Sequence, residues 1–107
     1  MNDKFLSLLG MARRAGKLSL GHDAAKGAVR YGKAQLVIIS SDAAQRLREE
    51  FAGIASSDER NTEILLTDYT MYAIGTAIGS KAGVLTVDDK GFAERLSYLY
   101  KEQHKED

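Results

Sequence analysis

An unbroken apolar run, Leu36–Ile39, is the feature that most constrains the fold of this chain. A strand that is apolar at every position is typical of a sheet with helices packed on both faces. Glu63–Leu66 and Gly83–Val87 also read as strands, and Lys17–Leu20 reads as a short extended piece. We therefore expect a small mixed sheet of about four strands, with Leu36–Ile39 at its centre.

Helices are expected between these strands, because apolar residues recur there at helical spacing and capping residues precede them. The chain has no proline, and several of its 10 glycines mark the helix ends. The expected helices cover residues 4–15, capped by Asn2 or Asp3, and 22–31, with further helices opened by Ser41 or Asp42, by Thr67 or Asp68, and by Asp88 or Asp89. Gly75 and Gly79, one helical turn apart, are expected to permit close helix packing. The alternation predicts an α/β protein, a three-layer α/β/α sandwich.

The same spacing predicts which faces of the later helices turn inward. The inward residues are Leu47, Phe51 and Ile54 in the third helix and Phe92, Leu96 and Leu99 in the last. Ser56–Asn61 is the best candidate for a loop, and the charged tail from about residue 101 is expected to fray, with His104 in solvent. We take residues 1–107 as one domain, because a chain of this length can bury a core of its own.

The charges are unevenly distributed, although the formal net charge is zero. Residues 1–33 hold seven cations against two carboxylates, or +5, and residues 34–107 hold eight against thirteen, or −5. This distribution favours contact of one end of the molecule with phosphate, and chance segregation on a solvated surface is the plainer alternative. The absence of cysteine excludes disulfides and thiolate metal sites, and the apolar runs are too short to span a membrane. We expect a cytoplasmic protein without a membrane partner.

The stretch "LSLGHDAAKGAVRYGKAQLVIIS" places Gly21 immediately before the second helix. The first turn of a helix exposes N–H groups and the positive end of the helix dipole, and a residue without Cβ lets a phosphate approach them. The cations around this turn form the candidate phosphate-binding face: Arg13, Arg14, Lys17, Lys26, Arg30 and Lys33. Two plainer interpretations stay open. One is that Gly21 is an ordinary N-cap, and the other is that Arg13, Arg14 and Arg30 complement the dipoles at the C-terminal ends of their helices.

Few residues of this chain suggest catalysis. Ser19, His22 and Asp23 are neighbours in sequence, whereas the groups of a catalytic triad converge from separate segments. Asp88 and Asp89 resemble a pair of magnesium ligands, but Asp between a strand and a helix is usually a cap. The sequence has no G-x-G-x-x-G, no Walker loop and no metal-spaced histidines. We therefore expect neither catalysis nor a bound cofactor or metal.

The order of elements and the glycine-bounded second helix resemble the ribosomal L7Ae and L30e family of kink-turn RNA-binding proteins, in particular its small bacterial YlxQ-like branch. The resemblance extends from "LLGMARRAGKLSLGHDAAKGAVRYGKAQLVIIS" through "AIGTAIGSKAGVLTVDDKGFAERL". It implies a non-catalytic, ribosomal-protein-like protein that recognises a sharply bent RNA, whose tandem sheared G·A pairs expose guanine edges. It also implies that a loop before the last strand supports a bulged nucleotide.

By position, this resemblance implies two groups of RNA-binding residues. The first group, at the start of the second helix, is Gly21, His22, Asp23, Lys26 and Gly27, and the second group, in the loop, is Ile78, Gly79, Ser80, Lys81 and Ala82. Asp23 stands where the family has Asn, and Gly27 where it has Lys, with Lys26 one residue earlier. Guanine N7 and O6 accept hydrogen bonds, so an Asn amide or a Lys ammonium can donate to them and an ionised Asp cannot.

The sequence therefore predicts an RNA-binding protein whose partners are RNA and ribosome-associated proteins. About four phosphate contacts would make log affinity fall with log salt at a slope near −3 to −4. An alternative is a protein-interaction module on the same fold that has lost specific RNA readout, which Asp23, Gly27 and the acidic remainder favour. A small enzyme with a phosphorylated ligand at the Gly21 end has weak support, since no activated nucleophile or acid/base pair is visible.

Overall fold

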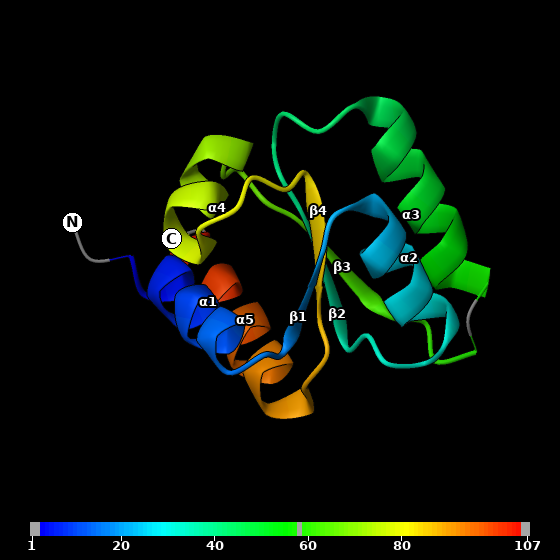
Figure 1. Ribbon diagram of the computed structural model, residues 1–107, viewed down its shortest axis with the longest axis horizontal. Helices are drawn as coiled ribbons and strands as arrows, with labels where there is room; N and C mark the ends of the chain where they lie inside the picture. Colours follow the sequence, from blue (N-terminus) through cyan, green and yellow to red (C-terminus); the bar gives the residue numbers. More distant parts are fainter. Residues whose placement is uncertain (1–2, 58, 106–107) are drawn as a thin grey trace.

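The computed structural model describes residues 3–57 and 59–105, in which helices and strands alternate (Figure 1). The elements are α1 (Lys4–Arg14), β1 (Leu18–Leu20), α2 (His22–Arg30), β2 (Leu36–Ile39), α3 (Gln45–Ser57), β3 (Glu63–Leu66), α4 (Met71–Ile78), β4 (Val84–Val87) and α5 (Lys90–Gln103). Three sequence predictions concern other residues. Asn2 as a cap, Asp58 in the loop and residues 106–107 of the tail lie outside the described residues.

The strands form one mixed sheet in the order β1-β4-β2-β3, and the predicted four-stranded mixed sheet is confirmed. β2 is parallel to β3 and antiparallel to β4, while β1 is antiparallel to β4. The predicted central position of Leu36–Ile39 is also confirmed, because β2 lies between two other strands and all of its residues are buried.

Helices cover both faces of the sheet, with α1, α4 and α5 on one face and α2 and α3 on the other (Figure 1). Side chains alternate along β2, so that Leu36 and Ile38 enter the core under the first group of helices. Val37 and Ile39 enter the second core, against Phe51 of α3. The predicted three-layer α/β/α sandwich is therefore confirmed. Within residues 3–57 and 59–105, no helix is long and apolar enough to cross a membrane.

Two of the predicted N-caps are confirmed. The Asp3 carboxylate accepts a hydrogen bond from the Leu6 N–H at 2.9 Å, at the start of α1. The Asp89 carboxylate accepts one from the Phe92 N–H at 2.9 Å, at the start of α5. Each carboxylate satisfies an N–H group that has no partner within its own helix.

α3 begins later than the sequence predicts, at Gln45 rather than directly after Ser41 or Asp42. Asp42 does bind a helix N-terminus, but that of α4: its carboxylate accepts a hydrogen bond from the Met71 N–H at 3.0 Å. This hydrogen bond lowers the pKa of Asp42. A capping residue serves whichever helix end the fold brings to it, and sequence adjacency does not fix that choice.

α4 is capped by Thr70, rather than by Thr67 or Asp68 as predicted. The Thr70 hydroxyl accepts a hydrogen bond from the Ala73 N–H at 3.1 Å. The Thr67 hydroxyl, which is buried, donates instead to the Ile39 carbonyl at 2.9 Å and joins the end of β3 to β2. Thr67 and Asp68 therefore make tertiary contacts, and Thr70 caps the helix.

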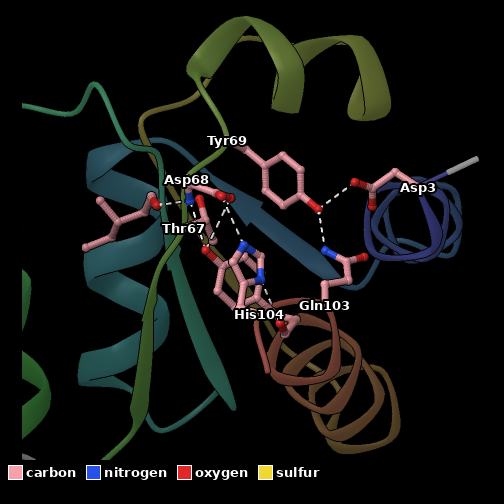
Figure 2. A network of polar contacts seen from close by, with 8 residues as sticks. Asp3, Thr67, Asp68, Tyr69, Gln103 and His104 are labelled. Carbon is pink, nitrogen blue, oxygen red and sulfur yellow. Dashed lines mark hydrogen bonds and ion pairs between the residues drawn. The ribbon is translucent and has the colours of Figure 1, made fainter. Parts of the chain in front are cut away.

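The end of α5 is held by polar contacts to the segment before α4 (Figure 2). His104 is exposed, in agreement with the predicted solvated side chain, but it also makes contacts that were not predicted: its Nε2 lies 3.0 Å from Asp68 Oδ2 and its Nδ1 lies 2.8 Å from the Tyr100 carbonyl oxygen. The imidazole also stacks on the Tyr100 ring, with centroids 4.0 Å apart. Nearby, the Tyr69 hydroxyl donates to the Asp3 carboxylate at 2.6 Å. These contacts connect α5, α1 and the start of α4.

The contacts of His104 predict a pH-dependent contribution to stability. Its hydrogen bond with Asp68 raises the pKa of His104 above the ordinary value of 6.5 and lowers the pKa of Asp68. A histidine whose pKa is higher in the folded protein than in the unfolded chain stabilises the fold when it is protonated. This stabilisation is complete below the pKa of the unfolded chain and is lost as pH rises through the pKa of the folded protein. We expect His104→Ala to lower the unfolding free energy by less than about 1 kcal/mol near pH 5.5, and by a smaller amount near pH 9.

Thermal unfolding at both pH values measures this difference. Lys105→Ala is the matched control, because it removes a cation beside His104 and leaves the contact with Asp68 in place. A loss of stability in His104→Ala that is equal at the two pH values would contradict the prediction.

Candidate nucleic-acid interface

Three loops meet at one end of the sheet: Leu20–Asp23, Ser40–Ala43 and Gly79–Gly83 (Figure 1). The Gly21 N–H donates to the Val84 carbonyl at 3.0 Å, and the Ser40 N–H donates to the Gly83 carbonyl at 2.9 Å. The start of α2 and the end of β2 are therefore both bonded to the chain where the loop enters β4.

Gly21 has a backbone conformation that other residues rarely adopt. Its φ is 89° and its ψ is 172°, a region that is essentially restricted to glycine. A Cβ at this position would meet no atom within 4 Å, so the space in front of α2 is open. Gly21 also has no side chain to cap the helix, and the N–H groups of the first turn point out of the helix start. This geometry suits the close approach of an anion.

His22, the first residue of α2, is held by two carboxylates. Its Nδ1 lies 2.8 Å from Asp23 Oδ1, and its Nε2 lies 2.9 Å from Glu50 Oε1 on α3. Both hydrogen bonds raise the pKa of His22, and the one with Asp23 has the larger effect. Glu50 Oε2 also lies 3.3 Å from Lys26 Nζ. Sequence reasoning missed Glu50, because 28 residues separate it from His22 and no local pattern links the two.

Ser19, His22 and Asp23 do not form a catalytic triad. The Ser19 hydroxyl donates to Asp88 at 2.6 Å, so it does not converge with His22. Asp88 also accepts from the Thr86 hydroxyl at 2.8 Å and lies 3.9 Å from Lys33 Nζ, and its side chain is only 4% exposed. Asp88 therefore joins β1 to β4 rather than capping α5. Among the residues that the structure describes, no group of three or more His, Asp and Glu side chains is arranged to hold a metal ion.

The predicted cations do not form one cluster. Lys26 is the central residue of α2, one helical turn from the His22 end, whereas Arg30 is the last residue of the helix. The Asp88 N–H donates to the Lys17 carbonyl at 2.7 Å, which places Lys17 at the other end of β1 from Gly21. Lys33 also lies beside Asp88. Lys26 and Arg30 are four residues apart, or roughly 6 Å along the helix axis, whereas Lys17 and Lys33 both lie near Asp88, at the end of the sheet away from Gly21.

Arg14 lies on the opposite face of the sheet, in a groove between α1 and α4. These helices approach closely at Gly10, where a Cβ would lie 2.9 Å from the Ala77 carbonyl oxygen. Close helix packing was expected at Gly75 and Gly79, but Gly10 is the glycine that permits it. Arg14 is therefore separated from the cations of α2 by the sheet.

The loop before β4 turns its middle residues to solvent. Ser80 and Lys81 are exposed, whereas Ile78 and Ala82 are buried. Gly79 has a φ of 80° and ends α4 in the left-handed conformation. It therefore terminates the helix, whereas the sequence predicted that it permits close helix packing. The loop thus presents one hydroxyl and one ammonium group to solvent, and the stem of the Lys81 side chain lies close to Gly75 of α4.

Comparison with known proteins identifies the class to which this fold and loop arrangement belong. The model of the Ribosomal protein L7Ae/L30e/S12e/Gadd45 family matches residues 3–97, and the chain belongs to this family. The RNA-binding protein YlxQ of Enterococcus faecium is 29% identical to it over 96 residues, which is 90% of each chain.

Solved structures share the fold. A protein of unknown function from Bacillus halodurans superposes with a TM-score of 0.87 and is 33% identical, covering 94% of this chain and 99% of its own. The Giardia lamblia 15.5kD RNA binding protein has a TM-score of 0.74 at 17% identity, covering 95% of this chain and 89% of its own. The second likeness supports the fold alone.

Proposed function

We propose that this chain is a non-catalytic RNA-binding protein that recognises a kink-turn or similarly bent RNA through the N-terminus of α2. Its family and the RNA-binding relative from E. faecium support RNA as the partner. The observation that best supports this site is the 3.0 Å hydrogen bond from the Gly21 N–H to the Val84 carbonyl. It joins an open, uncapped helix start to the loop that presents Ser80 and Lys81.

The separation of the cations suggests two kinds of RNA contact. The bend would lie at the loop end, near the α2 N-terminus, Lys26 and Lys81, where guanine edges are within reach of side chains. A stem that leaves the bend would follow α2 toward Arg30 and Lys33. Contacts between these cations and the phosphates of the stem would fix the position of the RNA and carry no sequence information. The proposal includes a cytoplasmic location, with ribosome-associated proteins near the RNA.

A protein-interaction module on the same fold is the second candidate. The observation that favours it is the pair of carboxylates, Asp23 and Glu50, that engage His22 at the start of α2. Anionic side chains oppose phosphate at this position, whereas they are compatible with a protein partner.

Titration of the purified protein with two RNAs distinguishes these functions. One RNA is a kink-turn, the other lacks its G·A pairs, and both are measured at two salt concentrations. We expect tighter binding of the kink-turn, with log affinity falling against log salt at a slope near −3 to −4 for about four phosphate contacts. Equal, salt-sensitive binding would indicate a basic face without guanine readout. Absence of binding to either RNA would favour the protein-interaction module.

A further inference from the structure

A carboxylate on α3 covers the cations at the start of α2. Glu50 Oε1 lies 2.9 Å from His22 Nε2, and Glu50 Oε2 lies 3.3 Å from Lys26 Nζ. The side chains are 42% exposed for His22, 32% for Glu50 and 30% for Lys26. Each is therefore partly covered, and the two cationic side chains are directed at Glu50 rather than at solvent alone.

These contacts change the electrostatics of the helix start. The second ring nitrogen of His22 faces Asp23 at 2.8 Å, so two carboxylates balance Lys26 and a protonated His22. Phe51 lies edge-on to the imidazole, with ring centroids 5.8 Å apart, and holds it against α3. The positive charge that residues 1–33 carry in the sequence is thus offset at this point by a residue from the acidic remainder.

We propose that Glu50 is an intramolecular competitor of RNA, whose carboxylate occupies the donors of His22 and Lys26 that RNA phosphate would use. This inference rests on the proposed function and assigns a role to a residue of α3, outside the two groups implied by the family resemblance. Glu50 thereby sets how tightly the α2 end binds RNA and how steeply that binding depends on salt.

Two physical arguments support competition over a purely structural role. Carboxylate and phosphate oxygens accept hydrogen bonds from the same imidazolium and ammonium donors, so phosphate must displace Glu50 to reach them. An ion pair this accessible to water contributes little to folding, and its loss leaves no charge buried. The net release of counterions is also smaller when phosphate replaces Glu50, because the freed carboxylate takes up a cation while the phosphate loses one.

Glu50→Gln tests this proposal, with Glu49→Gln as the matched control. Glu49 precedes it on α3 and accepts a hydrogen bond from Gln45 within the same helix at 2.9 Å, so both variants remove one negative charge from one helix. We expect Glu50→Gln to bind kink-turn RNA about three- to five-fold more tightly than wild type near 0.1 M salt. Its log–log salt slope should steepen by about 0.7 to 0.9, because no carboxylate is freed to take up a cation when Lys26 contacts phosphate. Glu49→Gln should stay close to wild type in both quantities.

The same substitution in a His22→Ala, Lys26→Ala background completes the test. If Glu50 acts by pairing with His22 and Lys26, Glu50→Gln should no longer tighten RNA binding once both of these residues are alanine. If wild type binds RNA and Glu50→Gln binds no more tightly than Glu49→Gln, the competition is overturned and the proposed function stands. If no variant binds RNA, both are overturned. Binding by Glu50→Gln without binding by wild type would support competition in its strongest form.

Discussion

Replacing Asp23 by Asn and Gly27 by Lys together should tighten binding to a kink-turn RNA by about 10- to 100-fold. The Asn amide and the Lys ammonium donate hydrogen bonds to the N7 and O6 acceptors of guanine, and the present pair cannot. Binding to the RNA without G·A pairs should change much less. The measurement is the dissociation constant of each RNA at fixed salt, for wild type and the double variant.

The structure accommodates both substitutions. Positions 23 and 27 are four residues apart on α2, so their side chains lie on the same helix face. The side chain of Asp23 is fully exposed, and a Cβ at Gly27 would meet no atom within 4 Å. Replacing a glycine inside a helix also favours the helix by about 0.5 to 1 kcal/mol. We therefore expect the variant to fold at least as well as wild type.

A control on α3 separates guanine readout from added charge. Glu49→Gln with Gly53→Lys has the same four-residue spacing and the same change in charge, and a Cβ at Gly53 also meets no atom within 4 Å. The control should leave the preference for G·A pairs unchanged. Equal gains for both RNAs in the α2 variant would show that it acts through charge alone, which would contradict the prediction.

Reversing charge at the loop end should have the opposite effect. Lys26→Glu with Lys81→Glu is expected to weaken RNA binding by about 50- to 100-fold near 0.1 M salt, because each phosphate contact contributes close to a factor of 8 there. The salt slope should become shallower by at least about 0.7 to 0.9, which is the contribution of the Lys81 contact, because Glu50 already neutralises Lys26 in wild type. Both quantities come from one set of titrations at several salt concentrations.

Lys4→Glu with Arg95→Glu is the matched control for this reversal. Both residues are exposed and border one groove between α1 and α5, on the other face of the sheet. The control changes the net charge by the same amount and should weaken binding far less. If the two double variants lost affinity equally, binding would depend on overall charge and the proposed site would be wrong.

The fold could be predicted from the sequence because its strongest patterns are local. An all-apolar β2 requires cover on both faces, and Leu36 and Ile38 do enter a different core from Val37 and Ile39. The caps of α1 and α5 were also predictable, since each capping residue adjoins its own helix. The start of α4 was predictable only in part, because the adjacent Thr70 caps it while Asp42 reaches the Met71 N–H from another loop.

The candidate site was predictable only in part. The glycine before α2 and the loop before β4 could be found as motifs, and the hydrogen bonds along β4 bring them together. Two features depend on tertiary structure and left no sequence signal. β1 carries Lys17 to the far end from Gly21, so neighbours in sequence are separated in space. Glu50 reaches His22 across the contact between α3 and α2.

Amide chemical-shift mapping during titration with kink-turn RNA tests the site most directly. The account predicts that the largest changes fall on Gly21, His22 and Ser80, with smaller changes toward Arg30. The amides of α5 should change little, because the sheet separates them from α2. Changes confined to α5 or to the groove between α1 and α4 would contradict the account, even if RNA bound tightly.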